Sequence, residues 1–195
     1  MTRVLVIDDH HPSRKNLVTA LNKSGYEVVG EGASGQTAFT LVSTSTPEIV
    51  FMAVGLPDQD GISVARKIMQ ATPLPIVLLT SHHDPETIDR AKRAGVMGYL
   101  IKPLREGELQ PTIELAISHF QEFTALQKQN ESLKKTLEAR KVIERAKGLL
   151  MQRRGLSEAE AFSLIQRKSM EMRKPMVEIA RAIILSQEVT TGKDN

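Results

Sequence analysis

The segment that decides the fold is IVFMAVGLPDQDG, residues 49–61. It opens with four apolar residues, and the loop that follows is rich in glycine, proline and aspartate. A short apolar run bounded by turn residues is typical of a strand buried on both faces of a parallel sheet. In such sheets the functional side chains lie beyond the carboxyl ends of the strands. Here that end is Ala53, whose side chain can do no chemistry.

Four further segments have the length and composition of strands, and helical patterns alternate with them. Helices are predicted from Pro12 to about Gly25, after Ser34, over residues 62–70 and over residues 85–94. This alternation predicts an α/β fold over residues 1–120, with a doubly wound, five-stranded parallel sheet. The five predicted strands are Arg3–Ile7, 27–30, Ile49–Ala53, 75–80 and Gly98–Ile101.

A long helical pattern begins near Glu106 and continues past the predicted sheet domain. From Phe123 to Leu137 its apolar positions recur every three or four residues, and Asn130 occupies a heptad a position. We expect residues 121–136 to form a coiled-coil linker helix that makes the protein a homodimer. A single amphipathic linker helix is the alternative. The residues expected to pack on the sheet are Ile113, Ala116, Ile117 and Phe120.

Residues 137–188 are predicted to form a small all-α domain of three helices. The first, over residues 137–151, continues or restarts the long helix and ends at Gly155. Ser157 and Glu160 have the spacing of a capping box, which opens the second helix. The third covers residues 177–185, and a disordered tail is predicted over residues 189–195.

Charge is distributed unevenly along the chain. Residues 1–133 hold 12 Lys+Arg and 15 Asp+Glu, whereas residues 134–174 hold 12 and 5. The basic segment favours a polyanionic partner, and the alternative is a solvated helical face. With no cysteine, the chain has no disulfide framework and no thiol nucleophile. The early acidic residues exclude a signal peptide, and no apolar run reaches about 20 residues, so we expect a cytoplasmic protein without membrane contact.

Polar residues follow three of the predicted strands: Asp8 and Asp9 the first, Thr80 the fourth and Lys102 the fifth. Because the carboxyl ends of parallel strands meet at one edge of a sheet, these side chains should converge. Paired carboxylates suit a divalent cation such as Mg2+. A lysine and a hydroxyl suit the oxygens of a phosphoryl group.

The segments VLVIDDH, PEIVFMAVGLPDQDG, VLLTS and GYLIKPL resemble those of a two-component receiver domain, which has a flavodoxin-like fold. The resemblance implies that Asp8, Asp9 and the carbonyl of Gly55 bind Mg2+. It implies that Thr80 and Lys102 contact the phosphoryl group. Thr80 and Tyr99 would be the switch residues, and a sensor kinase or another regulatory protein would be the partner.

The same resemblance aligns the phosphoacceptor aspartate with Ala53. Formation of an aspartyl phosphate needs a carboxylate nucleophile, which alanine lacks. We therefore expect no catalytic residue, and Mg2+ binding that is weak if it occurs. Asp58 or Asp60 could substitute for the phosphoacceptor, but each follows the strand by several residues, and turn formation is the preferred interpretation of both.

The segment RKVIERAKGLLMQRRGLSEAEAFSLIQRKSMEMRKPMVEIARAII resembles an ANTAR domain, the RNA-binding module of antiterminator response regulators. The resemblance implies a nascent RNA partner with paired stem-loops, whose binding prevents a terminator hairpin. An alternative for Lys147 is an ion pair with Glu144, and Gly148 could serve close helix packing. Cations of this segment could contact phosphates or stack on loop bases. The candidate RNA contacts are Arg140, Lys147, Arg153, Arg154, Arg167, Lys168, Arg173 and Lys174.

These observations predict an RNA-binding transcription antitermination regulator with a degenerate receiver, acting as a dimer that grips paired stem-loops. The first alternative is a regulator whose helical domain docks a partner protein. A DNA-binding regulator is the second alternative, although no recognition helix of the helix-turn-helix type is apparent. An enzyme is not expected, because the nucleophile position is Ala53.

Overall fold

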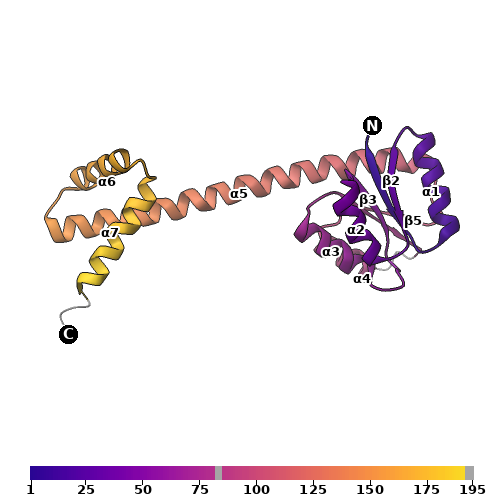
Figure 1. The fold of residues 1–195 in the computed structure, drawn as a ribbon, viewed down its shortest axis with the longest axis horizontal. Coiled ribbons are helices and arrows are strands. Elements are labelled where there is room, and N and C mark those ends of the chain that lie inside the picture. The colour runs from indigo at the N-terminus through magenta and orange to yellow at the C-terminus, as the bar shows by residue number, and fades with distance from the viewer. Residues whose placement is uncertain (82–84, 192–195) are drawn as a thin grey trace. The chain divides into compact units, whose positions relative to one another are not determined.

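The computed structural model describes residues 1–81 and 85–191 and divides into two compact units, Met1–Thr124 and Ala125–Asn195. In the first unit the strands form a parallel sheet with helices packed around it (Figure 1). The strand order is β2-β1-β3-β4-β5. The predicted five-stranded α/β fold is confirmed, and β2 extends two residues beyond its predicted end. The strands are β1 (Arg3–Ile7), β2 (Glu27–Gly32), β3 (Ile49–Ala53), β4 (Ile76–Thr80) and β5 (Gly98–Ile101).

Helices cover both faces of this sheet, which explains the unbroken apolar character of β3. Phe51 and Met52 are both fully buried, and they belong to the cores on opposite faces. The Phe51 face is covered by α1 (His11–Lys23) and the first turns of α5 (Glu106–Arg154). The other face is covered by the helices α2 (Gly35–Ser45), α3 (Gly61–Ala71) and α4 (Pro85–Arg93).

The start of α5 packs on the sheet as predicted. Ile113 and Ala116 are buried, Ile117 packs at the edge of the same core, and Phe120 is half-buried. The helix then continues without a break to Arg154, so no new helix starts at residue 137. Gly155 follows with a φ of +64°, a conformation that glycine adopts more readily than other residues.

The second unit contains the end of α5, α6 (Glu158–Met172) and α7 (Met176–Thr191). The predicted capping box is present, because Ser157 and Glu160 accept hydrogen bonds from each other's backbone N–H groups. A small core joins the three helices and consists of Ala146, Leu150, Ala161, Ile165, Ile179 and Ala180.

Three predictions for this unit need correction. The last helix is longer than 177–185, and it includes residues 189–191 of the predicted disordered tail. The rest of that tail, residues 192–195, lies outside the described residues. Gly148 does not serve close packing, because a Cβ atom there would meet nothing within 4 Å.

No helix within the described ranges is long and apolar enough to span a membrane.

Candidate functional sites

An open cavity of about 680 Å³ lies at the carboxyl ends of β1, β3 and β4. The parallel register brings these strand ends together, with Ile7 beside Met52 and Ala53 beside Leu79. His10, Ser13 and Ser81 also line the cavity and were not predicted to do so. The predicted residues that line it are Asp9, Ala53, Gly55, Thr80 and Lys102.

Asp8 lies beneath this cavity, and its side chain is fully buried. Its Oδ2 atom is 2.6 Å from Nζ of Lys102, and its Oδ1 atom accepts a hydrogen bond from the backbone N–H of His10. A buried carboxylate requires such partners, because burial of an unpaired charge is costly. Lys102 therefore neutralises Asp8, and each oxygen of that carboxylate already has a donor.

A magnesium site would require several oxygen ligands at the cavity, because Mg2+ binds oxygen atoms with near-octahedral geometry. Both oxygens of Asp8 accept hydrogen bonds, Asp9 is exposed at the cavity wall, and Ala53 contributes no oxygen. Within residues 1–81 and 85–191, no group of three His, Cys, Asp or Glu side chains is placed to hold a metal ion. The residues present thus fit Mg2+ poorly, and the expected weak binding stays a prediction.

Asp58 has a structural role that the sequence did not reveal. Its two carboxylate oxygens accept the backbone N–H groups of Gly35 and Gln36, at 2.8 and 3.0 Å, in the first turn of α2. These hydrogen bonds lower the pKa of the Asp58 carboxyl. The negative charge also complements the amino end of the α2 dipole.

The carboxylate of Asp60 also has partners within the fold. Its side chain accepts the N–H of Ser63 at 3.1 Å, which makes it the N-cap of α3, and it pairs with Arg90 at 2.6 Å. Neither Asp58 nor Asp60 lines the cavity that contains Ala53. Their preferred interpretation as turn residues is therefore consistent with their contacts.

The two predicted switch residues differ in exposure. Thr80 ends β4 and is 8% exposed, whereas Tyr99 in β5 is 46% exposed and pairs in register with Leu78. The peptide bond between Lys102 and Pro103 is cis. The switch roles of Thr80 and Tyr99 stay predictions.

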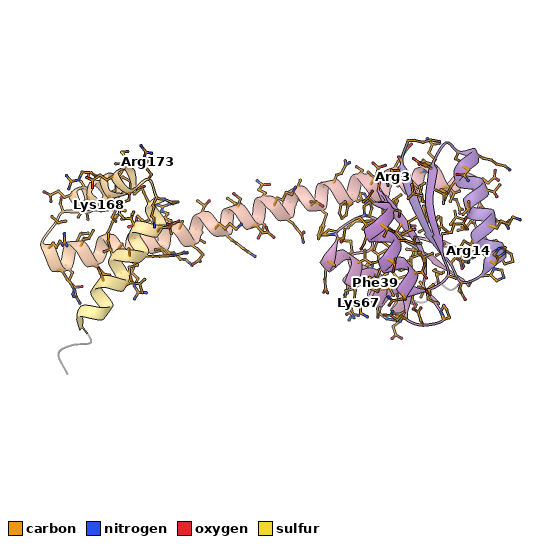
Figure 2. The ribbon with its side chains drawn as sticks, in the orientation of Figure 1. Arg3, Arg14, Phe39, Lys67, Lys168 and Arg173 are labelled. Carbon is orange, nitrogen blue, oxygen red and sulfur yellow. The ribbon has the colours of Figure 1, made fainter. Side chains whose placement is uncertain are left out.

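Seven of the eight candidate RNA contacts lie exposed on the second unit (Figure 2 labels Lys168 and Arg173). Arg167 and Lys168 share Glu171, at 3.9 and 2.6 Å, and Lys174 lies 3.9 Å from Glu178. The remaining four make no ion pair with any described residue, so their guanidinium groups keep their donors for a ligand. These four are Arg140, Arg153, Arg154 and Arg173.

Lys147 is the one buried member of the eight. Its Nζ atom lies 2.7 Å from Oε1 of Glu158 and 2.9 Å from Oε2 of Glu144. The pair with Glu144, which was the alternative to RNA contact, is therefore present. Hydrogen bonds to both carboxylates raise the pKa of Lys147, and the one from Lys147 lowers the pKa of Glu158. The ammonium group joins α5 to the start of α6.

Comparisons with known proteins match both units. The model for the response regulator receiver domain matches residues 4–114, and that for the ANTAR domain matches residues 131–184. The transcriptional regulatory protein PdtaR of Mycobacterium tuberculosis is 41% identical over 98% of this chain and 93% of that protein. The transcriptional regulatory protein YhcZ of Bacillus subtilis is 32% identical over 64% of this chain and 59% of that protein.

Among solved structures, the signal receiver domain of a modulated diguanylate cyclase from Desulfovibrio desulfuricans G20 has a TM-score of 0.58 and 32% identity. The alignment covers 62% of this chain and 97% of that domain.

Proposed function

Because the chain belongs to the response regulators in which a receiver domain is joined to an ANTAR domain, we propose that it is an RNA-binding antitermination regulator. Its helical domain, residues 137–188, would bind nascent RNA with paired stem-loops and prevent a terminator hairpin. Its receiver-like domain, residues 1–120, would regulate that output without catalysing a reaction. Acting on nascent RNA, the protein would work in the cytoplasm.

The observation that carries this proposal is the cationic surface of the second unit. Seven of the eight candidate arginine and lysine side chains are exposed on a bundle whose small core is apolar. Such cations bind phosphates and release counterions, so affinity for RNA should fall steeply as salt rises. Lys147 is not needed for this role, since its charge is matched by Glu144 and Glu158.

Dimerisation is the second part of the proposal. Residues 125–138 of α5 are all exposed in the single chain. Phe123, Leu126, Leu133 and Leu137 are between 42% and 62% exposed and follow a heptad spacing, with Asn130 at an a position. A second copy of the helix over residues 121–136 would bury these side chains. The dimer would thereby bring two helical domains to two stem-loops of one RNA.

The third part concerns the input. Ala53 cannot accept a phosphoryl group, and Lys102 is already paired with Asp8. The receiver-like domain would therefore respond weakly or not at all to a kinase and Mg2+. A regulatory protein that docks on this domain is the partner that the proposal favours.

The test measures binding of the full chain to an RNA with two stem-loops and to duplex DNA of equal charge. We expect tighter binding to the RNA, with an affinity that falls as salt increases. The double variant Arg153→Gln/Arg154→Gln should bind the RNA more weakly and with a smaller salt slope. Lys134→Gln/Lys135→Gln removes the same charge from the linker helix and should bind like the parent protein. Equal affinity for RNA and DNA, or affinity for neither, would contradict the proposal.

A further inference from the structure

The helical unit contains a groove that the cationic surface alone does not explain. It has a volume of about 410 Å³ and is lined by residues of α5, α6 and α7. This volume lies within the roughly 300–1,000 Å³ that is usual for small-ligand sites. Its floor is apolar and includes Leu164, Ile179 and Ile183, and Met172 stands at its wall with 58% exposure.

The rim of the same groove is basic. Arg154, Lys168 and Lys174 all line it, and among the lining residues that the structure describes only Glu178 carries a carboxylate. Arg154 makes no ion pair with a described residue, whereas Lys168 and Lys174 pair with exposed carboxylates of Glu171 and Glu178. Phosphate oxygens could replace these carboxylates at little cost, because exposed ion pairs are weak.

An apolar floor beneath a basic rim matches the chemistry of an unpaired nucleotide. A base that is not stacked in a helix exposes two flat apolar faces, and its sugar–phosphate chain carries negative charge. Aliphatic side chains and the thioether of Met172 can cover such a face. The guanidinium group of Arg154 can lie flat on a base or bind a phosphate. A base inside a duplex could not enter, since its faces are already stacked.

We propose that this groove receives one unpaired base from an RNA loop, while Arg154, Lys168 and Lys174 hold the flanking phosphates. The inference rests on the proposed RNA-binding function and names its recognition site. It explains how a domain with Phe162 as its only aromatic residue can recognise a loop without an aromatic stacking platform. The groove then distinguishes an unpaired loop from a continuous duplex of the same charge.

The experiment uses the full chain and a two-stem-loop RNA in which each loop nucleotide is made abasic in turn. Removal of the base leaves every phosphate in place, so it isolates the groove from the cationic surface. At one loop position, or more, we expect the abasic RNA to bind roughly tenfold more weakly, as for the loss of one buried base.

A substitution in the groove completes the test. Ala182 is exposed and lines the groove, so Ala182→Leu should obstruct it without changing the core or the charge. This variant should bind intact RNA roughly tenfold more weakly and be indifferent to the abasic position. Ala159→Leu is the matched control, since Ala159 is exposed on α6 and outside the groove. Thermal melting of both variants should match that of the parent protein.

Two results would overturn the inference while leaving RNA binding intact. One is equal affinity of the parent protein for the intact RNA and for every abasic RNA. The other is an Ala182→Leu variant that weakens intact and abasic RNAs by the same factor. Failure of the proposed function itself looks different, because the parent protein would then show no preference for the RNA over duplex DNA.

Discussion

At the scale of single residues, the proposed loss of phosphorylation depends on Ala53. It is 3% exposed and ends β3 at the cavity that Asp9, Thr80 and Lys102 also line. The missing group is one carboxylate, which would serve as a nucleophile and as a metal ligand. We expect the rest of the cavity to bind a phosphoryl group only if Lys102 can leave Asp8.

Ala53→Asp should therefore restore chemistry at this position. We expect this variant to bind Mg2+ more tightly than the parent protein and to become labelled by a small-molecule phosphodonor. Ala53→Asn supplies a side chain of similar size without a nucleophilic carboxylate and should stay unlabelled. Phosphorylation is read by intact mass. An unlabelled Ala53→Asp variant would contradict the expectation that the rest of the cavity can support phosphoryl transfer.

Asp58 gives a prediction about pH. Its pKa is lowered from the ordinary value of 3.8, so its ionised form stabilises the folded first unit. That contribution is complete above the ordinary value and is lost as the pH falls through the lowered pKa of the folded state. Asp58→Asn should thus lower the melting temperature at pH 7, and the difference from the parent should shrink below about pH 4. A difference that is constant from pH 7 to pH 3 would contradict this role.

Substitution by alanine should change the free energy of unfolding in opposite directions at Gly61 and at Gly148. A Cβ on Gly61 would clash with the carbonyl oxygen of Ala53, whereas one on Gly148 would meet nothing within 4 Å. Gly61→Ala should destabilise the first unit by about 1–3 kcal/mol or more. Gly148→Ala should stabilise the second unit by about 0.5–1 kcal/mol, since alanine favours a helix. Urea unfolding of each unit measures both, and a stabilised Gly61→Ala variant would contradict the close approach.

At the scale of elements, the strands were predicted better than the contacts between distant residues. The strands β1, β3 and β5 have their predicted bounds, because buried parallel strands are short apolar runs that turn residues delimit. The cap that Asp58 makes on α2 joins residues 22 and 23 positions apart, and no local pattern contains it. Local patterns likewise do not show that Lys147 meets Glu158 or that α7 reaches Thr191.

Most of the residues that were predicted to converge at the strand ends do line one cavity, because the sheet topology could be predicted. Topology alone brings the ends of β1, β4 and β5 to one edge, so Asp9, Thr80 and Lys102 could be placed together from sequence. Sequence could not reveal that Asp8 is fully buried and satisfied by Lys102 and His10, since burial depends on packing. The adjacency of His10 to the two aspartates was the only available signal.

The middle of α5 is the part of the chain that we expect to form the dimer interface. Leu126 and Leu133 are 58% and 62% exposed at heptad d positions. Leu126→Ser/Leu133→Ser should weaken the dimer by about 4 kcal/mol or more, since each substitution acts in both copies. Leu115→Ser removes an exposed leucine of the same helix outside the seam and should stay dimeric. Sedimentation measures the mass of each protein, and a dimeric double variant would exclude the coiled coil.

At the scale of the whole molecule, a receiver domain is combined with an ANTAR domain that carries a basic surface. The relative from Mycobacterium tuberculosis aligns along 98% of this chain, so the two parts occur together in a second protein. In this chain position 53 is alanine, and under our proposal the receiver-like unit therefore does not take up a phosphoryl signal in the usual way. The output should then depend on the dimer and on RNA concentration.

The most direct measurement is the affinity of the parent protein for a two-stem-loop RNA, with and without Mg2+ and beryllofluoride, a mimic of the phosphoryl group. The account predicts that the protein prefers this RNA to duplex DNA of equal charge and that its affinity is the same in both conditions. RNA binding that appears only with the phosphoryl mimic, or no preference for the RNA, would contradict it.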